Sequence, residues 1–225
     1  VFLGDDFELF PKLSVKLGLR YSFYTYLGPY KEYQYSSSDI IEENIIGTKE
    51  YSNNEIAYFD SGLDIRMNAS YNAGVEQFIN FSYNRNRQYI HMLSNSQSAN
   101  PLDTWKLTDK YIPPQIANQV SFGYNKTLIK DDLSVSADIY YKKMTDIKDF
   151  SRGSQYKFND HPETELVNAL GKAYGLEFMV KKDKGRFTGW LSYTYSRVFI
   201  KSNGSSVEKY INNGEYYPAS NDKPN

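Results

Sequence analysis

The sequence contains no cysteine, and only two of its 225 residues are histidine. The first absence excludes a disulfide framework, thiolate metal sites and a thiol nucleophile. The histidines, His91 and His161, stand in no metal-ligand spacing such as HExxH, and no GxSxG motif marks a serine nucleophile. No phosphate-binding glycine loop is present either. We therefore expect a protein that is not an enzyme and that holds no metal or cofactor.

Long apolar runs are also missing. No stretch of about eighteen apolar residues exists, as a membrane-spanning helix would require, and the mean hydropathy is −0.64. The net charge of −1 and the pI of about 6.2 leave no basic patch for nucleic acid. A low mean hydropathy is nevertheless compatible with a membrane β-barrel, because such a barrel has a polar interior and solvated loops.

Regular alternation of apolar and polar residues is what the sequence does have. In Leu13–Leu27, LSVKLGLRYSFYTYL, nearly every odd position is apolar or aromatic, and most even positions are polar. Successive side chains of a strand point to opposite faces, so this segment predicts a strand with one apolar and one polar face. It is longer than the five or six residues typical of soluble strands. A tilted strand that crosses a bilayer needs about nine to eleven.

Eight segments of this kind follow one another along the chain. They are Val1–Phe10, Leu13–Leu27, Ala57–Asn72, Gln77–Tyr89, Ile116–Leu128, Leu133–Ile147, Ala173–Lys181 and Arg186–Phe199. Their connections are alternately short and long, so antiparallel strands would place all short turns at one end and all long loops at the other. This asymmetry is typical of outer-membrane barrels, with short periplasmic turns and long extracellular loops. We expect an all-β fold, an antiparallel transmembrane β-barrel section of about eight strands.

The two faces of these segments differ in charge. The apolar faces carry no charge until the strand ends, and six charged residues on the opposite faces are expected to face the lumen. These are Lys16, Arg20, Asp64, Arg66, Asp138 and Glu177. A charge at the bilayer midplane costs about 2–4 kcal/mol, so lipid would favour this arrangement. A soluble barrel with an aliphatic interior shows the same alternation, but strand length, loop asymmetry and aromatic placement favour lipid.

Aromatic residues fall into two sets. Those on the apolar faces are expected at the membrane interfaces, which Tyr and Trp favour, although the β-propensity of aromatic residues alone would also place them in strands. This interface set is Tyr21, Phe23, Tyr71, Phe81, Tyr83, Tyr124, Tyr141 and Tyr193. The second set lies in the long connections, where the rings either contact a ligand or pack the loops. This loop set is Tyr30, Tyr33, Tyr35, Trp105, Tyr210, Tyr216 and Tyr217.

Six stretches carry a resemblance to a known family. They are LSVKLGLRYSFY at 13–24, FSYNRNRQYIHMLSNS at 81–96, PPQIANQVSFGYNKTL at 113–128, LSVSADIYYKKMTDI at 133–147, KAYGLEFMVKKDKGRFTGWLSYTYS at 172–196 and YYPASNDKP at 216–224. In their order and spacing they resemble the barrel of TonB-dependent outer-membrane receptors, especially those of Bacteroidota-type bacteria. The resemblance implies a barrel of twenty-two strands with an N-terminal plug domain in its lumen. Residues 1–225 would then be a partial barrel domain, without the plug and the closing C-terminal strands.

The resemblance also implies a function and a set of partners. The parent protein would import a scarce nutrient, such as a siderophore, glycan, peptide or cofactor, across the bacterial outer membrane. Its partners would be membrane lipid, its own plug domain and remaining barrel strands, TonB (through the missing N-terminal part) and the imported ligand. A surface lipoprotein is a further candidate. The lumen-facing charges would dock the plug, line the ligand path or form a hydrated wall.

Two other interpretations remain open at this point. One is a complete eight-stranded outer-membrane barrel of the small adhesin type, in which Val1–Phe10 must pair with Arg186–Phe199. The other is a soluble β-rich module that binds a glycan or peptide at its rim. Strand pairing at the two ends of the sheet tests the first, and dependence on detergent tests the second.

Overall fold

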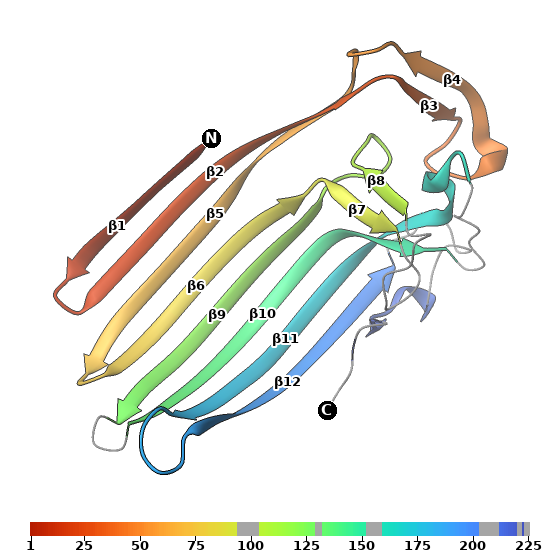
Figure 1. Ribbon diagram of the computed structural model, residues 1–225. Helices are drawn as coiled ribbons and strands as arrows, with labels where there is room; N and C mark the ends of the chain where they lie inside the picture. The colour runs from red at the N-terminus through yellow and green to blue at the C-terminus, as the bar shows by residue number, and fades with distance from the viewer. Residues whose placement is uncertain (94–103, 129–131, 152–158, 203–211, 220–221, 223–225) are drawn as a thin grey trace.

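A computed structural model describes residues 1–93, 104–128, 132–151, 159–202, 212–219 and 222. Most of them belong to one long, curved antiparallel sheet (Figure 1). Its strands, in spatial order, are β1 (Phe2–Phe10), β2 (Leu13–Leu27), β5 (Ile56–Gly74), β6 (Gln77–Gln88), β9 (Gln115–Leu128), β10 (Leu133–Phe150), β11 (Leu166–Lys182), β12 (Gly189–Ser202) and β13 (Tyr217–Pro218). The expected all-β, antiparallel class and the eight long strands are confirmed.

The sheet is open. β1 forms one edge and pairs only with β2, and β12 lies at the other side, where it pairs with β11 and with the two residues of β13. β1 and β12 therefore lie far apart (Figure 1). The complete eight-stranded barrel requires these two strands to pair, so among the described residues that alternative is wrong. No described helix is long and apolar enough to cross a membrane.

The connections alternate as expected. β1, β5, β9 and β11 end at one end of the sheet, where the short connections follow, and β2, β6, β10 and β12 end at the other (Figure 1). The long connections are not plain loops, however. The first contains a hairpin of β3 (Tyr30–Tyr35) and β4 (Ile45–Tyr51), and the second contains a hairpin of β7 (Ile90–Leu93) and β8 (Thr104–Leu107). Short 3₁₀ turns occur at η1 (Glu42–Asn44), η3 (Pro162–Glu165) and η5 (Asn212–Gly214).

Two strands extend beyond their expected ends. β10 continues to Phe150 and β11 begins at Leu166, so the connection between them is shorter than the sequence pattern indicated. The cause is a shift in pairing register between Met144 and Ile147, where Asp146 has a positive φ of 57°. An irregularity of this kind breaks the two-residue period, so the alternation ends before the strand does.

The register lines up side chains of one kind across the sheet. Phe81, Phe122, Ile139 and Leu176 are consecutive partners on four strands, and they are 38%, 50%, 57% and 46% exposed. Among the described residues no second layer covers this apolar face. The buried apolar cluster lies instead at the long-connection end, and it comprises Leu93, Ile112 and Leu166 with Phe150 packed against them. The sheet itself therefore encloses no dry core.

Candidate functional site

Three of the long connections meet at one end of the sheet. They form a surface that we call the rim assembly, made of the β3–β4 hairpin, the β7–β8 hairpin with the following residues 108–114, and η3. Hydrogen bonds join these parts across long sequence separations: Tyr30 to Asp109, Tyr35 to Glu163, and Lys110 to Glu32. The rim assembly is thus held by polar contacts between side chains as well as by its small apolar cluster.

Asp109 is the most connected carboxylate of the rim assembly and is only 2% exposed. Its Oδ1 accepts backbone N–H bonds of 2.9 Å from both Tyr111 and Ile112. Its Oδ2 accepts the Tyr30 hydroxyl at 3.2 Å and lies 3.0 Å from the Lys106 ammonium. A buried carboxylate is stable only when its oxygens are hydrogen-bonded and its charge is paired, and Asp109 meets both conditions. It fixes the segment after β8 against β3.

Two more buried carboxylates hold tyrosines of the first hairpin. Glu32, 5% exposed, accepts the Tyr51 hydroxyl at 2.9 Å and the Lys110 ammonium at 3.1 Å. Glu163, also 5% exposed, accepts the Tyr35 hydroxyl at 3.1 Å. Burial, followed by the nearby carboxylates, raises the pKa of Tyr35 above its ordinary value of 10.0. This phenol therefore remains a protonated donor across the physiological range.

The rim assembly is attached to the wall through Thr108. Its backbone carbonyl accepts the Tyr24 hydroxyl of β2 at 3.0 Å, and its hydroxyl lies 3.2 Å from Nε2 of His91. The imidazole of His91 is 4% exposed, and burial, assisted by the positive charge of Lys148, lowers its pKa from 6.5 to about 4. His91 is thus a neutral packing residue at pH 7. Among the described residues no cluster of three or more His, Asp or Glu could hold a metal ion.

The predicted loop aromatics take up mostly structural positions. Tyr30 and Tyr35 bind carboxylates, the Tyr33 ring lies 5.1 Å from that of His161, and Tyr217 donates to Asp149. Of the remaining three, Tyr216 lies beneath Lys172, whose Nζ is 4.1 Å from the ring centroid; Trp105 is 66% exposed; and Tyr210 lies outside the described residues. Trp105 is therefore the loop-set ring most open to an external ligand.

The six predicted lumen-facing charges share the polar face of the sheet. Arg20 is paired in register with Asp64, Gly18 with Arg66, and Asp138 with Glu177. Arg20, Asp64 and Arg66 line a hollow of about 320 Å³ near β1. Asp64 is 7% exposed and accepts one hydrogen bond, of 3.3 Å, from Ser22. Lys16 pairs instead with exposed Asp6 at 2.9 Å.

One further polar cluster was missed by the alternation pattern. Arg87, at the end of β6, donates a 2.8 Å hydrogen bond to the carbonyl of Ser61 and lies 3.6 Å from the Asp60 carboxylate. Its guanidinium occupies the space above Gly62, where a Cβ would stand 1.7 Å from Nη1. The single glycine in the middle of an alternating strand was the signal available in the sequence, because such a glycine often marks close approach of another group.

The apolar face carries the predicted interface aromatics. Tyr71, Tyr124 and Tyr193 lie in one register row with Ile79, Ala137 and Phe178 between them. Tyr21 packs edge-on against Phe23, with ring centroids 4.9 Å apart, and its hydroxyl contacts Ser61.

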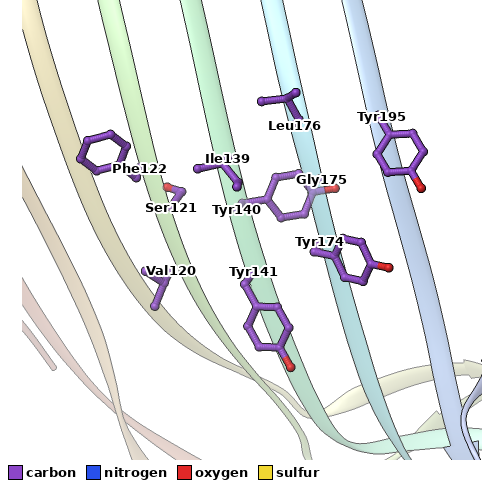
Figure 2. Close-up of a pocket in the computed structure, with 10 residues that line it drawn as sticks. All are labelled: Val120, Ser121, Phe122, Ile139, Tyr140, Tyr141, Tyr174, Gly175, Leu176 and Tyr195. Atoms are coloured by element: carbon purple, nitrogen blue, oxygen red, sulfur yellow. The ribbon is translucent and has the colours of Figure 1, made fainter.

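A groove of about 470 Å³ crosses β9 to β12 (Figure 2). Its lining includes Val120, Phe122, Ile139 and Leu176, with Tyr141 and Tyr174 towards the long-connection end. Tyr195 of β12 is the register partner of Leu176 of β11. Neither Tyr174 nor Tyr195 was among the predicted interface aromatics. Such a lining can bind alkyl chains and offers little to a polar ligand.

The likeness to TonB-dependent receptors stays a prediction, because it is made from the stretches of sequence quoted above. Comparison of the chain with protein-family models, with curated proteins and with solved structures finds no match to any of them.

Proposed function

We propose that these residues form part of the wall of a transmembrane β-barrel in a bacterial outer membrane. One observation carries this proposal: the apolar face of the sheet is exposed over several strands, and the two register rows that contain Ala137 and Ile139 carry no charge. Leu17, Phe122 and Ile139 are 41%, 50% and 57% exposed, with no covering layer among the described residues. Contiguous apolar surface on this scale marks a protein or membrane contact. Hydrocarbon would cover all of it at once.

The open edges support a barrel larger than this chain. In a bilayer every backbone N–H and C=O needs a partner within the protein, so a spanning sheet must close. Within the described part of the chain, β1 and most of β12 each have one edge that pairs with no other strand. Further strands on both sides would pair these edges. This requirement agrees with the twenty-two strands implied by the family resemblance.

The polar face supports a transport role for that barrel. It carries Arg20, Asp64 and Arg66 on β2 and β5, and Asp138 and Glu177 on β10 and β11, as a water-filled or plugged lumen requires. We infer that the parent protein is a TonB-dependent active transporter of a scarce nutrient. Its rim assembly would give the ligand its first contact, and the hollow beside Asp64 would contact the plug or the passing ligand. No covalent chemistry is required of these residues.

Paired arginine substitutions test the membrane part of the proposal. Ile139→Arg places a charge on the apolar face, whereas Thr194→Arg places one on the polar face at a similar height. The first should lower barrel stability by about 2–4 kcal/mol and reduce the amount assembled in outer membranes. The second should assemble as the wild type does. Equal effects of the two changes, or a detergent-free monodisperse protein, would refute membrane embedding.

The transport part needs a separate test on the full parent protein. We expect its N-terminal part to crosslink to TonB in energised cells and to lose this crosslink when the proton motive force is dissipated. The reading frame upstream of Val1 should encode a plug domain, and the frame beyond Asn225 should encode further strands. If the barrel assembles in the membrane but no such crosslink forms, the proposal of a barrel wall stands and TonB-coupled import is excluded.

A further inference from the structure

Two lysines face each other across neighbouring strands of the wall. Lys143 of β10 and Lys172 of β11 are direct register partners. Two positions further along these strands, towards the short turns, Tyr141 and Tyr174 are also register partners. Because alternate residues share a face, both lysines lie on the apolar face, just beyond the two tyrosines.

This juxtaposition is unfavourable unless an anion lies nearby, because like charges directly opposite each other destabilise a sheet. Among the described residues neither lysine forms an ion pair with a carboxylate. Lys143 is exposed, and Lys172 contacts the rings of Tyr216 and Phe199, at 4.1 Å and 5.5 Å from Nζ to the ring centroids.

A neighbouring cation on the same face behaves differently. Arg197 of β12, the register partner of Tyr174, is paired with Asp222 at 2.9 Å. Asp222 thus serves as the counter-ion of Arg197. Within the described part of the chain, no carboxylate does the same for Lys143 or Lys172.

The apolar groove lies next to the lysine pair, on the side towards the short turns. The register places the two lysines at the long-connection end of this face. Towards the short turns follow the Tyr141 and Tyr174 rings and then the apolar lining around Ile139 and Leu176 (Figure 2). A lipid with a phosphorylated headgroup presents matching chemistry in the same order: an anion, a polar linkage and a hydrocarbon chain. Free phosphate would use only the first of these three.

We propose that this surface binds one anionic, phosphate-bearing lipid of the outer leaflet. Its phosphate lies between Lys143 and Lys172, and one acyl chain occupies the groove between Val120, Ile139 and Leu176. This inference rests on the proposed function, because only the proposed membrane orientation places the long connections, and with them the lysine pair, on the outer side. The bound anion removes the repulsion between the two lysines.

Native mass spectrometry of the full parent barrel in detergent tests this, with phosphatidylglycerol and phosphatidylcholine as probes. We expect the wild type to retain phosphatidylglycerol about thirtyfold more strongly than phosphatidylcholine, because two basic residues near an anionic lipid together contribute about 2 kcal/mol. K143Q/K172Q should lose this preference. K142Q, the adjacent lysine on the polar face, should keep it. Val120→Trp fills the groove and keeps both charges. It should weaken the binding of phosphatidylglycerol and leave the binding of inorganic phosphate unchanged.

Three results would overturn the proposal. Retention of the preference by K143Q/K172Q overturns it, and so does equal binding of the two lipids by the wild type. Competition by inorganic phosphate, with no effect of Val120→Trp, would show an ion site without an acyl groove and would also overturn it. In all three cases a barrel that embeds normally leaves the proposed function intact. A protein that stays out of membranes overturns both proposals.

Discussion

The hydroxyl of Tyr30 donates a hydrogen bond of 3.2 Å to the carboxylate of Asp109, 79 residues further along the chain. This bond joins the first long connection of the sheet to the second. With the two backbone N–H bonds and Lys106, it makes Asp109 the residue on which the rim assembly depends most.

Asp109→Ala should loosen the rim assembly without unfolding the sheet. The change leaves the half-buried Lys106 ammonium, the Tyr30 hydroxyl and two backbone N–H groups without their acceptor, which costs about 3 kcal/mol. Hydrogen exchange should accelerate in β3 and in residues 108–112 and stay unchanged in β10 and β11. Glu43→Gln, at an exposed carboxylate, is the matched control. Unaltered exchange in β3 would show that the contact between the two connections is not a determinant of order.

Acidification should weaken the β7–β8 hairpin through His91. Burial holds the pKa of His91 at about 4 in the folded protein, against 6.5 when exposed, so below pH 6.5 the open form binds the additional proton. The free energy of opening should fall by about 2 kcal/mol at pH 5, with no change above pH 7. Hydrogen exchange of Ile90–Leu93 between pH 7 and pH 5, corrected for intrinsic rates, measures this.

His91→Gln is the control for that pH dependence. Glutamine retains a side-chain donor and acceptor near Thr108 but does not titrate, so the opening free energy of this variant should be the same at both pH values. If wild type and variant respond alike, another group is responsible.

Gly62→Ala should displace Arg87 from the wall. The new methyl group would occupy the position of the guanidinium, which can swing away at the expense of its hydrogen bond to Ser61 and its pairing with Asp60. We expect a loss of about 1–2 kcal/mol, measured as a lower denaturant midpoint of the parent barrel.

A double-mutant cycle isolates that effect. In an Arg87→Gln background the same Gly62→Ala change should cost much less, because the contacts are already gone. Gly47→Ala in β4, where the nearest atom is 3.7 Å from the added Cβ, should be close to neutral. Additive effects at positions 62 and 87 would contradict the packing described.

The long strands were predictable because a two-residue period persists over many residues in each. Leu13–Leu27 was placed with both ends correct, and Leu133 was correctly placed as the start of β10. The register then followed from the turns, and it puts the six charged residues on one face of the sheet; that this face lines a lumen stays a prediction. These features depend on local alternation, which a single sequence records.

The hairpins of the rim assembly were not predictable by that means. Tyr30–Tyr35 is only six residues long, and its carboxylate and phenol groups are satisfied by partners far away in the chain, such as Asp109 and Glu163. A segment of this kind reads as a polar loop, because nothing local reveals that its polar groups are buried. The extra length of β10 was hidden by the irregularity between Met144 and Ile147.

The central claim is that lipid covers the apolar face and water the polar face. Because the sequence contains no cysteine, single cysteines can carry a spin label at Phe122, Ile139 and Leu176 and at Ser121, Asp138 and Glu177. We predict strict alternation in the membrane-embedded parent barrel: the first three labels collide with oxygen, and the last three with a water-soluble nickel reagent. Apolar-face labels that reach the nickel reagent, or that are shielded from both, would contradict the claim.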